Sequence, residues 1–271
     1  MADAANEFTQ QNARDEVERW AGSASPALAR ELFAVLAILD ENGALRRALA
    51  DPSYEGPRRE QVVRRIFADK VSPDAVEIVA HLAGRRWSDD REFADALEHA
   101  GVSLTAASAE NRAGLQGLEQ VVVQLIAFKG VLDGSHELQR ALSDQRAGVE
   151  AKTRLAHRLT PGASDEALLL VEQAVLSPRG ALVGRLVERF AEEVAARRQR
   201  WIAHVTTSRP LTEDQRGRLQ QQLNSLYGKD LKLTVDVDPA LLGGLKVQVG
   251  EEVIDGSVAA RLDELRQRIG A

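Results

Sequence analysis

Cysteine is absent from this chain of 271 residues. Its absence excludes a disulfide framework, a thiolate metal site and a cysteine nucleophile, and is typical of proteins of the reducing cytosol. Aromatic residues are also scarce, at 4% of the sequence, so the core must be built mainly from Ala, Leu and Val. That composition favours closely packed helices, and the length predicts two or three domains.

Basic residues are not in excess, since the net charge is −6, and nucleic-acid binding is therefore not expected. We interpret the short arginine pairs, such as Arg58-Arg59, as solvated side chains that mostly lie late in helices. Long apolar runs are missing too. The longest, residues 34–39 and 121–128, are shorter than the roughly 20 residues that cross a bilayer. We expect no direct membrane insertion, and a cytoplasmic chain unless a partner draws it to a membrane.

Motifs that carry catalysis are missing as well. The histidines are spread over separate predicted elements, without a pair at metal-ligand spacing, and neither a GxxxxGK[ST] loop nor a GxSxG elbow occurs. The glycine-rich segment Leu241 to Gly244 lacks the downstream lysine and following helix of a phosphate loop, so a turn is the better interpretation. The sequence predicts no catalytic residue, no metal and no cofactor.

From Asp15 to about Ala196, apolar residues recur at helical spacing between short polar breaks. The first clear stripe is Leu28, Leu32, Val35, Leu36 and Leu39. Further inward faces are predicted at Val62, Val63 and Ile66, and in a later helix at Leu182, Leu186, Phe190 and Val194.

The helical pattern repeats after a shift of 93 positions, which gives seven identities within thirteen positions between residues 39–51 and 132–144. A period near ninety residues is too long for a helix-pair solenoid, so we predict two helical bundles that arose by duplication. The alternative is coincidence in a chain rich in Ala, Leu and Arg. The polar residues Ser103, Thr105 and Ser108 indicate a linker near Gly101 to Asn111.

The last seventy residues change to the pattern strand, helix, strand, strand, helix. Alternation begins at Trp201, and Thr212 with Gln215 forms a capping box for the helix that follows. Leu231 to Val237 alternates again, and Leu245 to Val249 follows after a glycine-bearing loop, so we predict a hairpin between these two strands. An Asp-Gly turn then leads to a helix capped by Ser257.

This C-terminal region resembles the signature of the delta subunit of F-type ATP synthase, the bacterial relative of the mitochondrial oligomycin sensitivity conferral protein. The residues at the family's spacings are Asp238, Pro239, Leu242, Gly243, Gly244, Val249, Ile254, Asp255, Gly256, Ser257, Arg261 and Leu262. A second family segment is represented by Val205-Thr206-Thr207-Ser208. We interpret these residues as determinants of the fold and not as catalysts.

The resemblance implies a mainly α protein with a small α+β domain and three parts. Residues 1–105 would form an extra N-terminal bundle of a long bacterial form, residues 106–199 a delta-type bundle and residues 200–271 the α+β domain. It also implies a non-catalytic stator subunit, present once in the proton-translocating ATP synthase on the cytoplasmic side of the cell membrane. Such a subunit links the catalytic head to the stalk b subunit and resists the torque of the rotor.

In the family, the helical domain binds N-terminal helices of the alpha subunits in an apolar groove. Here the candidate groove residues are Leu118, Val122, Leu125, Ile126 and Val171, and the rival interpretation is that they are ordinary core. The stalk b subunit would contact Val258, Leu262 and Leu265 of the terminal helix. The extra bundle either makes a second contact along the stalk or packs against its copy to stiffen the chain. A stand-alone helical adaptor is the alternative function.

Overall fold

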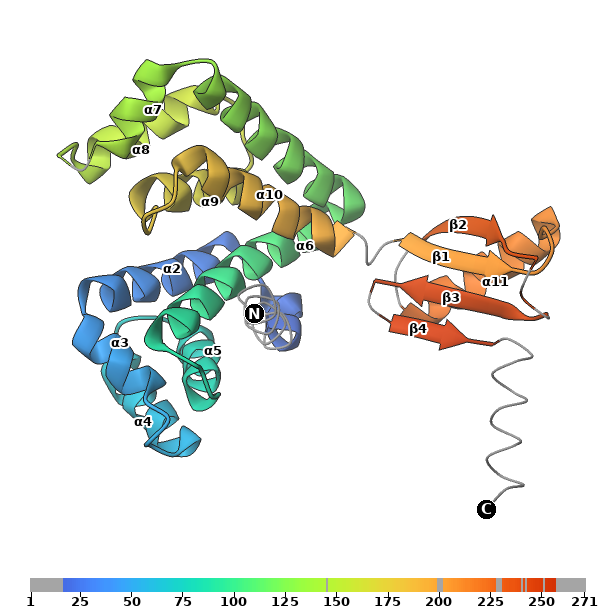
Figure 1. The fold of residues 1–271 in the computed structure, drawn as a ribbon, viewed down its shortest axis with the longest axis horizontal. Coiled ribbons are helices and arrows are strands. Elements are labelled where there is room, and N and C mark those ends of the chain that lie inside the picture. The colour runs from blue at the N-terminus through green and yellow to red at the C-terminus, as the bar shows by residue number, and fades with distance from the viewer. Residues whose placement is uncertain are drawn as a thin grey trace. The chain divides into compact units, whose positions relative to one another are not determined.

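A computed structural model describes residues 17–144, 146–198, 202–227, 231–239, 241, 243–250 and 252–256. The chain divides into two compact units, Met1–Ala195 and Ala196–Ala271. The first is helical, and the second combines a small sheet with a helix (Figure 1). The predicted class, mainly α with a small α+β domain, is confirmed. The further division of the first unit into 1–105 and 106–199 stays a prediction.

The helices of the first unit follow one another with short connections (Figure 1). They are η1 (Ala21–Ser23), α2 (Pro26–Glu41), α3 (Gly43–Ala50), α4 (Gly56–Phe67), α5 (Pro73–Gly84), α6 (Asp90–Asp133), α7 (His136–Ser143), α8 (Val149–Leu159), α9 (Asp165–Leu176) and α10 (Val183–Arg198).

Helix α2 illustrates why these segments are helical. Ser25 caps it by accepting a hydrogen bond from the Leu28 amide at 3.2 Å, and Pro26 fits the first turn, where no amide donor is needed. The whole predicted stripe from Leu28 to Leu39 is buried. In α4 the prediction was partly wrong. Val62 is 39% exposed, whereas Val63 and Phe67 face the core.

Arg59 is not the solvated side chain that the sequence indicated. It is 3% exposed, and its guanidinium donates to the carbonyl oxygens of Arg85 at 2.9 Å and Gly84 at 3.2 Å. These carbonyls lie at the C-terminal end of α5, where backbone acceptors lack helical partners. Arg59 therefore fastens α4 to the end of α5.

Helix α6 runs through the middle of the first unit and contacts η1, α2, α3, α5, α7 and α9. The linker predicted at Gly101 to Asn111 is wrong, because this segment is helical and mostly buried. The helix is instead kinked at Ala113 and Gly114, and Gly114 has φ 57° and ψ −139°. By length and composition alone α6 could cross a membrane, although one third of its most apolar stretch is buried within this chain.

The duplication is visible in the order of the helices. Helices α7, α8, α9 and α10 begin 92 or 93 residues after α3, α4, α5 and α6, and the second half of α6 corresponds to α2. One pattern of hydrogen bonds at a helix start is repeated in both copies. The Ser72 amide donates to Glu31 Oε2 at 3.1 Å, and the Ser164 amide donates to the corresponding residue, Gln124, at Oε1 and 3.1 Å. Each serine hydroxyl donates to the same oxygen and also caps its helix.

The second unit contains β1 (Ile202–Thr207), α11 (Glu213–Tyr227), β2 (Lys232–Val237), β3 (Leu245–Val249) and β4 (Glu252–Asp255). The sheet order is β2-β1-β3-β4, with β1 parallel to β2 and antiparallel to β3. The predicted hairpin between β2 and β3 is therefore wrong, because β1 lies between them. The hairpin joins β3 to β4, a strand that the sequence pattern did not reveal.

One face of this sheet forms a core with α11. Ala203, Val205, Leu233, Val247 and Val249 are buried there, and the helix contributes Leu223. The predicted capping box opens α11: the Thr212 amide donates to Gln215 Oε1 at 3.0 Å, and the Gln215 amide donates to Thr212 Oγ1 at 3.3 Å. The terminal helix predicted after Ser257 lies outside the described residues.

Candidate partner-binding surface

The five residues predicted to line a groove do not share one surface. Leu118, Leu125 and Val171 are buried in the core of the first unit, so they leave no surface for a partner. Val122 is half-buried, and Ile126 is 48% exposed. Residues 118, 122 and 125 recur at helical spacing, but that spacing does not reveal which edge of the stripe is covered by the rest of the chain. The accessible part of the predicted groove is therefore Val122 and Ile126.

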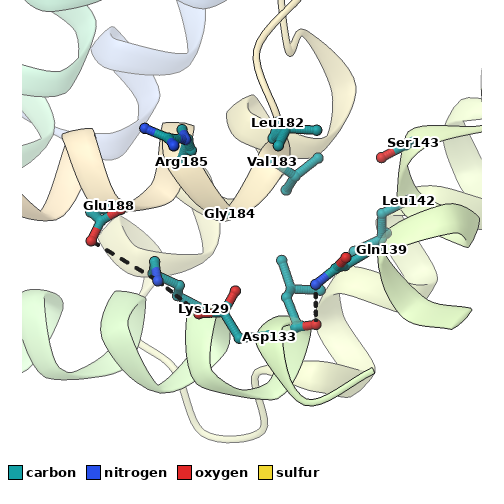
Figure 2. A pocket seen from close by; sticks show the side chains of 11 residues that line it. Lys129, Asp133, Gln139, Leu142, Ser143, Leu182, Val183, Gly184, Arg185 and Glu188 are labelled. Atoms are coloured by element: carbon teal, nitrogen blue, oxygen red, sulfur yellow. Dashed lines mark hydrogen bonds and ion pairs between the residues drawn. The ribbon is translucent and has the colours of Figure 1, made fainter. Parts of the chain in front are cut away.

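A hollow of about 380 Å³ opens one turn further along α6 (Figure 2). Its walls come from the end of α6, from α7 and from the start of α10, and they are Lys129, Leu132, Asp133, Gln139, Leu142, Ser143, Leu182, Val183, Gly184, Arg185 and Glu188. At its rim Leu182 is 68% exposed. The sequence placed Leu182 in the inward stripe of α10, but this residue precedes the helix. We name this hollow, together with Val122 and Ile126, the α6–α10 groove.

The charges of the α6–α10 groove are arranged around one lysine (Figure 2). Lys129 Nζ lies 2.7 Å from Asp133 Oδ2 and 4.0 Å from Glu188 Oε1. The hydrogen bond to Asp133 raises the pKa of Lys129. In the first copy the residue that corresponds to Lys129 is Leu36, which is fully buried. At this position the second copy thus has a lysine between two carboxylates, where the first copy has a buried leucine.

The corresponding carboxylates of the first copy, Asp40 and Asp95, bind an arginine of the second copy. Arg179 Nε lies 3.1 Å from Asp40 Oδ2, and Arg179 Nη1 lies 2.7 Å from Asp95 Oδ1. Nearby, Glu98 of α6 pairs with Arg189 of α10, and His99 Nδ1 lies 2.9 Å from Glu193 Oε1. Contacts between α2 and α9 add to this junction. The two copies are therefore packed against each other within one unit.

Glu98 at this junction is 2% exposed, and burial raises its pKa above the ordinary 4.5 even though Arg189 and Arg179 oppose the shift. The folded state therefore holds this proton more tightly than the unfolded chain. Stability is lost as the pH rises from the ordinary carboxyl range through the raised pKa.

We expect Glu98→Gln to remove this loss, because the amide is neutral at every pH. In denaturant unfolding between pH 4 and 8, the stability of the variant relative to the original chain should rise with pH. Glu77→Gln is the opposite control, because the hydrogen bond from Arg64 lowers the pKa of Glu77. That variant should be less stable at neutral pH and equal in acid. If Glu98→Gln were instead less stable than the original chain at neutral pH and equally stable in acid, the raised pKa of Glu98 would be wrong.

Part of the signature lies at one end of the sheet in the second unit. Because β1 and β2 are parallel, with Thr207 opposite Val237, their ends bring Ser208 and Asp238 together. The Asp238 amide donates to the Thr207 carbonyl oxygen at 2.8 Å. Gly243 and Gly244 have φ of 140° and 86°, values that favour glycine.

The signature also supports the β3–β4 hairpin. The Gly256 amide donates to the Leu245 carbonyl oxygen at 2.9 Å, and a Cβ on Gly256 would lie 3.1 Å from that oxygen. Val249 is buried, while Ile254 and Asp255 are exposed on β4. The described signature residues thus build turns and strand ends. Leu242, Ser257, Arg261 and Leu262, and the predicted contacts Val258 and Leu265, lie outside the described residues.

Among the described residues, no group of three or more His, Asp or Glu side chains is placed to hold a metal ion. Two histidines each contact a single carboxylate. One is His99 with Glu193, and another is His157, which contacts Glu172 on α9. Both contacts join helices of the first unit, α6 with α10 and α8 with α9.

Comparison with known proteins decides the family. The sequence model described as "ATP synthase delta (OSCP) subunit" matches residues 102–269. The chain is 53% identical over 271 residues to ATP synthase subunit delta of Kocuria rhizophila, with 100% of both chains covered. It is 49% identical over 251 residues to that of Arthrobacter sp. (strain FB24), with 91% of each covered. Identity to the Renibacterium salmoninarum subunit is 48% over 255 residues, with 94% of each covered.

The chain belongs to the ATP synthase delta (OSCP) subunit family. The resemblance stated from the signature is thus confirmed. Within this delta subunit the family match begins inside α6, so helices α2 to α5 precede it. The Kocuria delta subunit nevertheless matches along its whole length, so it also has the additional N-terminal residues.

Proposed function

We propose that this delta subunit joins the catalytic head of the ATP synthase to the stalk b subunit and holds the head against the torque of the rotor. Its family makes it a non-catalytic subunit of the peripheral stalk, and it belongs to a membrane-bound complex through that assembly. Two linked units suit a connecting role, because each can serve a different partner. The observation that carries the proposal is the match to delta subunits over the full chain.

For the head, we propose that N-terminal helices of the alpha subunits bind in the α6–α10 groove. An amphipathic helix needs an apolar strip with polar edges. Leu132, Leu142 and Val183 supply apolar walls, and exposed Leu182 and Ile126 extend them. A stable interface usually buries roughly 1,200–2,000 Å² in total, so such a helix would have to extend beyond the hollow.

For the stalk, we propose that the b subunit binds the second unit through Val258, Leu262 and Leu265, with one delta subunit per complex on the cytoplasmic side. A stand-alone adaptor remains the alternative function, but such a protein would not need the family signature.

The stalk proposal is tested in the full chain with Val258→Asp, Leu262→Asp and Leu265→Asp combined. We expect binding to the C-terminal segment of the b subunit from the same genome to fall at least tenfold, because charges at an apolar contact are costly to desolvate. Binding to an alpha N-terminal peptide should be unchanged, which is the internal control. Truncation at residue 236 would be less informative, because it would cut β2 and remove β3. Full retention of b binding, measured by calorimetry, would refute the assignment.

A further inference from the structure

The loop between α9 and α10 bounds two hollows. Its residues Ser177, Pro178, Arg179 and Ala181 line a polar hollow that also includes Asp40, Arg46 and Asp95 of the first copy. The residues that follow, Leu182 to Arg185, form one wall of the α6–α10 groove. A single short segment therefore touches the first copy at one end and shapes the candidate binding surface at the other.

The contact with the first copy is made by one well-placed side chain. Arg179 is 18% exposed and bridges Asp40 at 3.1 Å and Asp95 at 2.7 Å, while Glu98 lies 3.8 Å away. A guanidinium presents several donors in a rigid fork, so it can hold two carboxylates at once. The backbone geometry of the loop is thus tied to α2 and α6.

The backbone at this point is also unusual. Arg179 has φ 50°, in the left-handed region, and Gly180 has φ 84°. A non-glycine residue seldom adopts positive φ, and such a conformation persists where its surroundings over-determine it. Here a hydrogen bond from the Ala181 amide to the Pro178 carbonyl oxygen at 2.8 Å closes the turn, and the ion pairs with Asp40 and Asp95 fix the side chain of Arg179.

The duplication gives an internal comparison. Asp133 and Glu188 of the second copy correspond to Asp40 and Asp95, and they hold Lys129 from their own copy. In the first copy the buried Leu36 replaces that lysine, and Arg46 of α3 reaches only Asp40, with Nη1 3.5 Å from Oδ1. Arg179 of the second copy bridges Asp40 and Asp95. The first copy thus has a receptor for the loop, built from the same positions.

We propose that Arg179 is a positioning residue through which the first copy fixes the wall of the α6–α10 groove. The extra bundle would then act on head binding from within the chain, and not as a second contact along the stalk. The binding part of this proposal rests on the proposed function of the groove, whereas the structural part does not.

Amide hydrogen exchange of the full chain tests the structural part without any partner. In Arg179→Gln we expect exchange of residues 181–186 to rise at least tenfold. Asp95→Asn should cause a smaller rise. Exchange in the double variant should be only slightly faster than in Arg179→Gln, because both changes break the same ion pair. Arg64→Gln is the matched control, since Arg64 pairs with Glu60 and Glu77 in the first copy, away from the loop. Unchanged exchange in Arg179→Gln, or an equal rise in the control, would overturn the proposal.

Binding of a labelled peptide with the N-terminal residues of the alpha subunit tests the consequence. We expect about fivefold weaker binding by Arg179→Gln and no change by Arg64→Gln. Arg179→Lys should restore part of the affinity, because one ammonium can still bind one carboxylate. If the peptide binds but Arg179→Gln does not weaken it, the positioning role is wrong. If exchange rises as expected and the peptide does not bind even the unaltered chain, the positioning role stands and the proposed groove function fails.

Discussion

Replacing Gly114 by alanine is expected to lower the free energy of unfolding of the helical unit by about 2 kcal/mol. With φ 57° and ψ −139°, this residue lies in a region that is essentially restricted to glycine. Gly117→Ala should cost a similar amount for another reason. A Cβ there would overlap the carbonyl oxygen of Ala109, which is backbone and cannot rotate away. Either change requires α6 to alter its bend and so disturbs the packing on both sides.

Chemical denaturation followed by circular dichroism measures both effects. Gly130→Ala is the matched control on the same helix, because a Cβ at that position meets no atom within 4 Å. Alanine there should stabilise the helix by about 0.5 to 1 kcal/mol, as expected for an exposed helical glycine. If Gly114→Ala behaved like this control, the kink would not need its glycine, and the description of α6 would be wrong.

Substitution of Leu182 by aspartate is expected to weaken binding of the alpha N-terminal peptide about thirtyfold. Large apolar side chains at the centre of an interface commonly contribute about 2 kcal/mol or more. Leu182 is 68% exposed in the free chain, so the change should not disturb the fold. The loss would come from a charge that must be desolvated against the helix and that adds to the negative Asp133 and Glu188 in the same groove.

Fluorescence anisotropy of the labelled peptide provides the affinity, and thermal unfolding verifies the fold. Val149→Asp is the matched control, since Val149 is 65% exposed on α8 and does not line the hollow. Leu182→Ser separates lost apolar contact from added charge. Equal affinity of Leu182→Asp and Val149→Asp would show that the peptide binds elsewhere.

Local signals in the sequence predicted much of this fold correctly. The buried stripe of α2 and the Thr212–Gln215 box depend on neighbours within one turn, so spacing is enough. The duplication was also predictable, because corresponding helices preserve their length and order.

The sequence predictions failed where contacts between distant parts of the chain determine the structure. Polar residues in α6 indicated a linker, yet Thr105 donates to the Gly101 carbonyl at 2.8 Å and Ser108 to Glu166 at 3.2 Å, so both hydroxyls are satisfied inside the core. β1 lies between β2 and β3 in the sheet. The alternation of apolar and polar residues predicts that a segment is a strand, but it does not predict which strand it pairs with. The groove needed the three-dimensional assembly, because Leu182 and Lys129 are 53 positions apart in sequence.

Helix α6 has a mechanical consequence for a subunit that must carry load. It contacts α2 of the first copy and α9 of the second, and its two helical segments meet at the kink. A pull on either bundle is therefore transmitted through the backbone at this kink and through the packed contacts between the bundles. Elastic yielding would concentrate at Ala113 and Gly114, where the regular backbone is interrupted. This pair sets how far the two bundles can flex under strain.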